Sequence, residues 1–213
     1  MDKHVSNMPH AKAFERGLTS QLGEDRAREI VAHAGERYDD LYARREHYEH
    51  GSLRQHLEGG ILPGVALYRT LLAECETQEE AMSLTGVVFQ EWAAEDRKRM
   101  ERLARLPGYY WILRATISSI MRHTFPEEGW QREWLEKSGN AVAFNMKSCF
   151  YQDVLERYGV PELTELYCKS DDLIYEDLSP KVRWARTRTL GRGDDCCDFR
   201  FERVRRPPST PVM

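Results

Sequence analysis

Residues 141–149 read Ala141-Val142-Ala143-Phe144-Asn145-Met146-Lys147-Ser148-Cys149, and this stretch decides the fold. Its large apolar side chains, Val142, Phe144 and Met146, recur at every second position, and the polar Asn145 and Lys147 lie on the other face. Because successive side chains of an extended chain point to opposite faces, this period of two predicts a strand. The residues before about 125 show the spacing of helices instead. The change of period predicts an α+β fold: an N-terminal helical half packed on a small antiparallel sheet, with helices interspersed.

Two further stretches near the C-terminus carry the signal of strands. Residues 182–190 are rich in β-branched residues and contain Trp184. Residues 197–204 alternate, with Cys197, Phe199 and Phe201 on one face. Gly191-Arg192-Gly193-Asp194 forms a turn between them, so we predict an antiparallel hairpin. The expected sheet therefore contains Phe144, Trp184 and Phe199.

Apolar residues at helical spacing predict helices at residues 23–48, 65–74, 77–106, 109–123, 150–158 and 162–175. Gly59-Gly60 and Pro63-Gly64 interrupt the chain before the second of these, and Thr77-Gln78-Glu79-Glu80 has a capping-box pattern. We expect residues 1–20 to be loose, residues 21–206 to form a single domain, and residues 207–213 to be a flexible tail. Within the domain, the helical half extends to about residue 125 and the mixed half covers residues 130–204.

Length and charge exclude several classes of function. A chain of 213 residues can bury a real core, and its net charge of −4 does not favour a polyanionic partner. Basic and aromatic residues are not interleaved, so we expect no nucleic-acid binding. We expect no membrane span, because no apolar run approaches the roughly 18 residues that one needs. The first residues lack an apolar signal core, which predicts a cytoplasmic protein.

Four of the five cysteines lie in the last third of the chain: Cys149, Cys168, Cys196 and Cys197. We expect thiols rather than disulfides in the cytoplasm. Cys149 falls where a strand passes into a helix, and the helix N-terminus favours a thiolate, so we predict a lowered pKa and the strongest candidate nucleophile or thiolate ligand. Cys168 lies three and four residues before Asp171 and Asp172, on one helical face.

Alternatives to a catalytic role stay open for these cysteines and for the polar residues near them in the sequence. Cys197 and Cys168 are also compatible with ordinary packing, and Cys196 should point away from Cys197. No Cys-x-x-Cys spacing supports a structural zinc site. All histidines lie at or before His123, so a Cys-His pair would need His56 or His123 from the helical half. Arg186 and Arg188 alternate with threonines, either as a solvated face or as a carboxylate clamp.

The chain resembles the L-2-amino-thiazoline-4-carboxylic acid hydrolase family in short blocks that keep their order between about residues 60 and 203. The blocks are Ile61-Leu62-Pro63, Ala66-Leu67-Tyr68, Phe144-Asn145-Met146-Lys147-Ser148-Cys149-Phe150-Tyr151, Tyr158-Gly159-Val160-Pro161-Glu162-Leu163, Cys168 with Asp171, Arg186-Thr187-Arg188-Thr189-Leu190, and Gly193 with Cys197-Asp198-Phe199-Arg200-Phe201.

This resemblance implies a hydrolase that opens a small carboxylated heterocycle with a ring C=N bond, similar to 2-aminothiazoline-4-carboxylate. It implies thiols from Cys149, Cys168 and Cys197, and proton transfer or orientation by Asp171 and Asp198. Recognition of the substrate carboxylate falls to Arg186, Thr187 and Arg200. No cofactor is required if a cysteine is the nucleophile, whereas a zinc-type metal is the alternative if the thiols converge. A homodimer is left open.

The C-terminal half is also similar to 4-vinyl-reductase-like small-molecule-binding domains. That resemblance implies the same α+β architecture around an apolar pocket. The alternative function is therefore a non-catalytic ligand-binding, sensor or adaptor domain.

Overall fold

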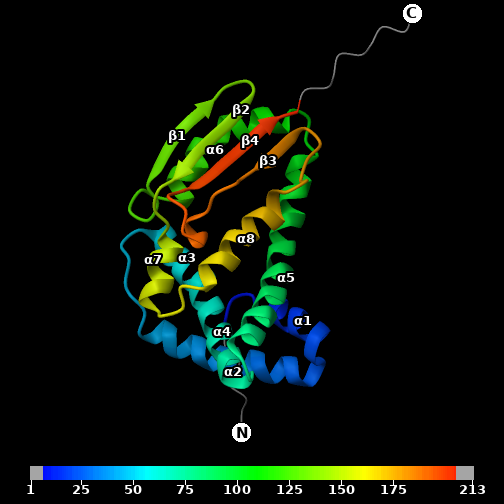
Figure 1. Ribbon diagram of the computed structural model, residues 1–213, viewed down its shortest axis with the longest axis vertical. Helices are drawn as coiled ribbons and strands as arrows, with labels where there is room; N and C mark the ends of the chain where they lie inside the picture. The colour runs from blue at the N-terminus through cyan, green and yellow to red at the C-terminus, as the bar shows by residue number, and fades with distance from the viewer. Residues whose placement is uncertain (1–6, 205–213) are drawn as a thin grey trace, which may run out of the picture.

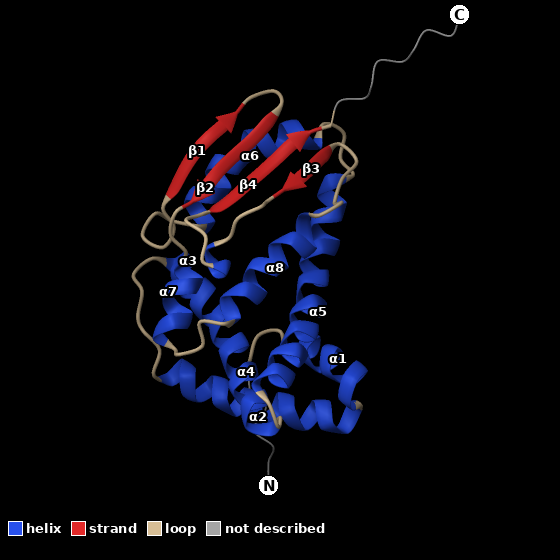
Figure 2. Ribbon diagram, in the orientation of Figure 1, coloured by secondary structure: helices blue, strands red, loops and turns tan. Residues whose placement is uncertain are grey.

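A computed structural model describes residues 7–204, in which helices come first and a four-stranded sheet follows (Figures 1 and 2). The helices before the sheet are α1 (Ala11–Leu22), α2 (Glu24–Ala43), α3 (Gly51–His56), a π-helical turn (Leu57–Ile61), α4 (Leu62–Glu74), α5 (Gln78–Ala104) and α6 (Tyr109–Thr124). The remaining elements are β1 (Arg132–Lys137), β2 (Ala141–Met146), α7 (Phe150–Arg157), α8 (Leu163–Tyr175), β3 (Val182–Ala185), a 3-10 turn (Leu190–Arg192) and β4 (Cys197–Arg203). The predicted α+β fold in a single domain is confirmed.

The long helix α5 connects the two ends of the molecule. Figure 1 shows it running from the end formed by α1, α2 and α4 up to the sheet. The predicted cap at its start is present, because the Thr77 side chain accepts a hydrogen bond from the Glu80 amide at 3.1 Å. Helix α8 packs along α5, and it lies below the strands in Figure 1, whereas α6 lies behind the sheet.

The N-terminal segment corrects one expectation. We predicted that residues 1–20 would be loose, but α1 covers Ala11–Leu22 and fully buries Phe14 and Leu18. Gly17 allows this packing: a Cβ atom there would lie 2.9 Å from the Val88 Cα of α5. Residues 1–6 and the predicted tail at 207–213 fall outside the described part of the chain.

The Gly59-Gly60 pair does not break the chain as predicted. Instead, α3, the π-helical turn and α4 follow one another without an intervening loop. A π-helical turn widens a helix by one residue and is often found at functional sites. The glycines serve close packing: Cβ atoms at Gly60 and Gly64 would lie 2.6 Å from the Tyr151 hydroxyl and 2.2 Å from the Tyr167 hydroxyl, respectively.

The sheet is antiparallel with the strand order β1-β2-β4-β3. Phe144 of β2 is opposite Phe199 of β4, and their rings stack at 5.1 Å. Trp184 of β3 is opposite Phe201. One face of the sheet is thus aromatic and faces the helices, whereas the other carries charged pairs such as Arg183 with Glu202.

Strand predictions hold for β2 and β4 and need correction elsewhere. Strand β1 was not predicted, since its sequence is mostly charged and a bulge lies between Trp134 and Glu136. Strand β3 ends at Ala185 rather than at residue 190, and an irregular loop with a 3-10 turn replaces the tight hairpin turn. Across residues 7–204, no helix combines the length and apolar character needed to cross a bilayer.

Replacing Phe14 with alanine tests whether α1 belongs to the core. Because Phe14 is fully buried, Phe14→Ala should lower the free energy of unfolding by about 3–5 kcal/mol in chemical denaturation. Leu22→Ala, at a 36% exposed position of the same helix, should cost much less. Equal, small effects of both substitutions would mean that α1 does not contribute to the core.

Candidate functional site

A cavity of about 450 Å³ lies between the aromatic face of the sheet and helices α5, α6 and α8. Strands β2 and β4 contribute Phe144, Met146, Cys197, Phe199 and Phe201 to its wall. The alternation in β4 that we predicted from sequence is therefore the feature that places Cys197 in this wall. Most of the remaining wall is apolar.

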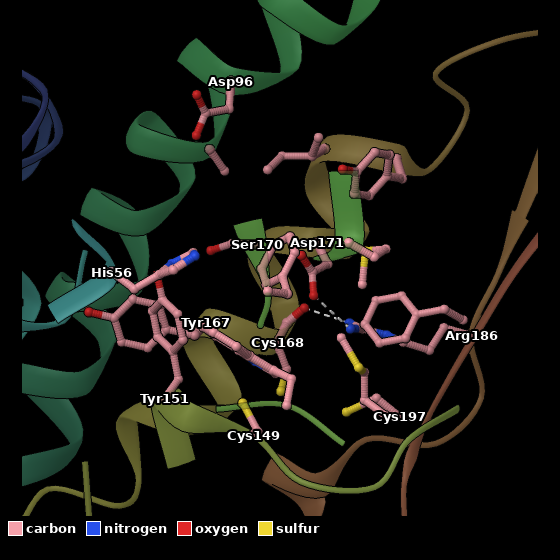
Figure 3. A pocket seen from close by; sticks show the side chains of 18 of the residues that line it. His56, Asp96, Cys149, Tyr151, Tyr167, Cys168, Ser170, Asp171, Arg186 and Cys197 are labelled. Carbon is pink, nitrogen blue, oxygen red and sulfur yellow. Dashed lines mark hydrogen bonds and ion pairs between the residues drawn. The ribbon is translucent and has the colours of Figure 1, made fainter. Parts of the chain in front are cut away.

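One group of polar side chains in the cavity lies around three thiols (Figure 3). Cys149 is the N-cap of α7, directly after the strand β2 segment. Cys168 and Asp171 lie one turn apart on α8, and Cys197 begins β4. Arg186 follows the last residue of β3. Five candidates that the sequence identified thus line one cavity.

Arg186 is the centre of this polar group. Its side chain is only 1% exposed, and it donates hydrogen bonds to Asp171 at 3.0 Å, to Asp172 at 2.7 Å and to the Cys168 carbonyl. Trp184 holds Asp172 from the other side through a bond from its indole nitrogen at 3.0 Å. Because a buried cation needs anionic partners, this contact ties the end of β3 to α8.

Asp171 is the carboxylate that faces the cavity. Burial raises its pKa to about 6, and the neighbouring Asp172 charge adds to this effect, while the Arg186 charge opposes it. Its side chain is still 39% exposed, and that exposure is toward the cavity that it lines. A ligand in the cavity can therefore reach a carboxylate that changes charge close to neutral pH.

Cys168 and Cys197 interact through their thiol groups. The Cys197 thiol donates a hydrogen bond to the Cys168 sulfur, and this bond lowers the pKa of Cys168 against the opposing effect of burial. The Arg186 charge and the Gly191 amide lower the pKa of Cys168 further. Donating this bond, together with burial, raises the pKa of Cys197. The neighbouring Asp171 charge acts in the opposite direction on the pKa of Cys168. Of the two sulfurs, Cys168 is therefore the one that loses its proton more easily.

The 3-10 turn at Leu190–Arg192 supports both sulfurs. The Leu190 amide donates to the Cys197 sulfur at 3.3 Å, and the Gly191 amide donates to Cys168. A Cβ atom at Gly191 would lie 3.0 Å from the Cys168 sulfur and 3.1 Å from a Thr164 methyl carbon. The turn can approach this closely because residue 191 has no side chain.

Cys149 corrects the prediction of a lowered pKa. The amides of the α7 N-terminus do favour its thiolate, but burial is the larger effect and raises the pKa of Cys149 to about 12. The sequence shows the helix start but not the depth at which the thiol lies. Cys149 is therefore a neutral thiol of the cavity wall at neutral pH.

Three predicted site residues lie on the other side of the sheet. Asp198 and Arg200 alternate with Cys197 and Phe199 along β4, and Arg200 lies 3.9 Å from Glu136. Asp198 accepts bonds from the Thr187 amide at 2.8 Å and the Thr187 hydroxyl at 2.7 Å. Asp198 and Arg200 thus do not reach the cavity, because one step along a strand reverses the direction of the side chain. Thr187, in the loop after β3, bonds to Asp198 and does not line the cavity either.

Asp198 has a structural role that the motif did not reveal. Besides Thr187, it accepts a hydrogen bond from the Arg188 amide at 2.6 Å. Burial would raise its pKa, but these bonds outweigh burial and hold the pKa of Asp198 below its usual value. It therefore fixes the loop between Arg186 and the 3-10 turn. Cys196, buried beside Arg188 and Lys147, packs near this loop.

The cavity wall also contains Tyr151 and Tyr167, which sequence reasoning did not assign to the site, beside His56, which it named only as a possible partner for a cysteine. The His56 ring approaches the Tyr151 hydroxyl at 3.0 Å and the Thr124 carbonyl at 2.8 Å. Burial lowers the pKa of His56, so the ring is neutral. Tyr167 also lines the cavity and donates to the Gly60 carbonyl at 2.9 Å. The glycines at 59–60 were the available signal, but we interpreted them as a break.

His56 and His123 were the two predicted partners for a cysteine. His56 lies in the cavity wall, with Tyr151 and Tyr167 beside it in Figure 3. His123 is exposed on α6 and bonds to the Ser119 carbonyl of its own helix. Within residues 7–204, no group of three or more histidine, cysteine or acidic side chains is arranged to hold a metal ion.

A model of the L-2-amino-thiazoline-4-carboxylic acid hydrolase family matches residues 54–201. These residues include the π-helical turn, all of the sheet except the last two residues of β4, and every polar group of the cavity described above. The comparisons with curated proteins and with solved structures found no match.

Alkylation with iodoacetamide tests the assignment of charge among the cavity thiols. Because only a thiolate reacts, Cys168 should be labelled faster than Cys149 and Cys197 at pH about 8, as measured by peptide mass spectrometry over time. Faster labelling of Cys149 would contradict the assignment. A Gly191→Ala variant should slow the labelling of Cys168, since the added methyl group meets its sulfur.

Proposed function

Since the chain belongs to the L-2-amino-thiazoline-4-carboxylic acid hydrolase family, we propose that it hydrolyses a small carboxylated cyclic amidine in this cavity, with Cys168 as the nucleophile. The observation that carries this proposal is the meeting of three thiols, Asp171 and the buried Arg186 in one cavity, where the pKa of Cys168 is lowered. A thiolate is the reactive form of cysteine, and a cavity with few, convergent polar groups is typical of a small-molecule site.

The substrate class has one electrophilic carbon. In a 2-aminothiazoline, this carbon is bonded to the ring sulfur, the ring nitrogen and the exocyclic nitrogen. Protonation of the amidine makes the carbon more electrophilic and gives the ring a positive charge. The Asp171 carboxylate is the group that we propose to hold this amidinium, because it faces the cavity one helical turn from Cys168.

The first half of the reaction forms an enzyme adduct. The Cys168 thiolate adds to the amidinium carbon, and the C=N electron pair moves to the ring nitrogen. The C–S bond of the ring then breaks, and the leaving sulfur takes a proton from the Cys197 thiol. Sulfur leaves more readily than nitrogen, because a thiol is a stronger acid than an amine. The product of this half is an isothiourea on Cys168.

Water completes the reaction. It adds to the same carbon, and the bond to Cys168 breaks so that the thiolate returns. One proton of the water restores Cys197, and the other is released to the solvent. The balance is one protonated heterocycle plus one water giving a ring-opened ureido thiol and one proton. Arg186 positions Asp171 and stabilises the Cys168 thiolate before it attacks and again when it leaves.

Arg186 has a different role here from the carboxylate clamp predicted from sequence. Three of the five N–H groups of its guanidinium already bond to Asp171, Asp172 and the Cys168 carbonyl. A substrate carboxylate would therefore meet two protein carboxylates at this point. Arg99, which also lines the cavity and is mostly exposed beside Asp96, is the cation that we propose for the substrate carboxylate.

The nucleophile is tested by replacing single cysteines. With 2-aminothiazoline-4-carboxylate as substrate, Cys168→Ser should lower kcat on the order of 10³-fold or more, because a serine hydroxyl at this position is not ionised. Cys75→Ser, outside the cavity, should retain activity, and circular dichroism should show that both variants fold. An active Cys168→Ser variant together with an inactive Cys149→Ser variant would assign the nucleophile to Cys149 instead.

The pH profile tests the role of Asp171. Its pKa of about 6 lies above the usual value, so the carboxylate is charged above pH 6 and becomes neutral below it. If the charge holds the amidinium, protonation of Asp171 should add a fall in kcat/KM of about tenfold per pH unit below pH 6, beyond the fall caused by protonation of Cys168. Asp171→Asn should lower kcat/KM above pH 6 and remove this added limb while keeping that of Cys168, whereas Asp96→Asn should keep both. An unchanged limb in Asp171→Asn would exclude this role.

A further inference from the structure

The part of the cavity away from the thiols is an apolar chamber. We define it by the wall residues Trp92, Met100, Ile117, Met121, Phe125 and Trp130, which come from α5, α6 and the segment before β1. Figure 3 shows Cys149, Cys168 and Cys197 along one side of the cavity, with Asp96 on the opposite side. Two methionines in this wall make it adaptable in shape, because the unbranched thioether fits irregular surfaces.

The cavity has a larger volume than the parent heterocycle, 2-aminothiazoline-4-carboxylate, would fill. At the packing density of protein interiors, a five-membered ring with an amino and a carboxyl group occupies roughly 150 Å³. The cavity measures about 450 Å³. When the amidine lies against Asp171 and Cys168, about two thirds of the space is left, and it is bounded mainly by the apolar chamber.

The aromatic part of this wall is rigid. The Trp130 ring is 3% exposed and contacts Phe125 at 5.1 Å and His56 at 4.9 Å between ring centroids. His56 is neutral, so the charged side chains on this side of the cavity are Asp96 and its ion-pair partner Arg99 of α5, at the edge of an otherwise apolar wall. Water molecules find few hydrogen-bond partners against this apolar wall, so the transfer of an apolar group from water into the chamber is favourable.

We propose that the substrates of this protein are cyclic amidines that carry an apolar substituent, of the size of a benzyl group, on a ring carbon. The amidine lies at the Asp171 and Cys168 end, and the substituent fills the apolar chamber. The position of the amidine rests on the proposed function; the preference for an apolar substituent rests on the volume and lining of the chamber alone.

Calorimetry with a matched set of ligands tests the preference. The set comprises 2-aminothiazoline-4-carboxylate, its 5-benzyl derivative, and a derivative with a polar hydroxylated chain of similar length at the same carbon. The benzyl compound should bind at least tenfold more tightly than the parent, because its apolar surface leaves water. The polar-chain compound should gain nothing. Equal or weaker binding of the benzyl compound would overturn the proposal.

Variants of α5 and α6 test whether the tighter binding of the benzyl compound arises in the chamber. Ile117→Trp fills the chamber from α6 and should reduce the ratio of the two dissociation constants, parent over benzyl, from at least ten to about one. Met100→Phe narrows the chamber from α5, and it replaces Ile117→Trp in this test if that variant does not fold. Ile112→Trp, on the exposed side of α6, should keep the wild-type ratio. A ratio unaffected by both chamber variants would contradict the proposed location.

Turnover in the same set separates this proposal from the proposed function. Tighter binding of the benzyl compound without ring opening of any ligand would support the chamber and reject the hydrolase. Equal kcat/KM values for parent and benzyl compounds, with equal affinities, would support the hydrolase and reject the preference.

Discussion

The burial of one cation, Arg186, determines the arrangement on which the cavity depends. A guanidinium that is 1% exposed must be surrounded by acceptors, and here they come from one helix: Asp171, Asp172 and the Cys168 carbonyl. Because all three acceptors lie on α8, their hydrogen bonds to Arg186 fix how α8 is rotated about its own axis. That rotation turns Cys168 and the free side of Asp171 toward the sheet. The same charge stabilises the Cys168 thiolate, so packing and reactivity follow from one contact.

Residues outside the cavity hold this arrangement in place. Asp198 lies on the solvent side of β4, yet its three hydrogen bonds to Thr187 and Arg188 fix the loop that begins at Arg186. That loop ends in the 3-10 turn whose amides approach both sulfurs. The Asp198 carboxylate thus acts on the site through the backbone. Asp198 directly follows Cys197 in the sequence, but it supports the site from outside the cavity and does not line it.

Much of the fold could be predicted from periodicity, because alternation directly reports a half-buried strand. It placed Cys197 on the face of Phe199 and Phe201, and the cavity confirms that face. Strand β1 escaped prediction because its sequence is mostly charged and lies at the sheet edge. Helix α1 escaped because its burial depends on a close contact between Gly17 and Val88, more than 70 positions along the chain.

The site was harder to predict than the fold, since it depends on depth and on distant contacts. A helix N-terminus suggested a thiolate at Cys149, but its burial has the larger effect. His56 and Tyr151 meet only because glycines of the π-helical turn leave room for the tyrosine. No local pattern contains that information.

The central claim is that Arg186 and Cys197 together make Cys168 the thiolate of the cavity. The most direct measurement is a pH titration of thiolate ultraviolet absorbance in folded wild-type protein and in the Cys168→Ser and Arg186→Lys variants. The account predicts a step in wild type below the ordinary cysteine pKa of about 8.5, absent in Cys168→Ser and shifted upward in Arg186→Lys, whose ammonium cannot satisfy the same three acceptors. A step that persists in Cys168→Ser, or that stays in place in Arg186→Lys, would contradict it.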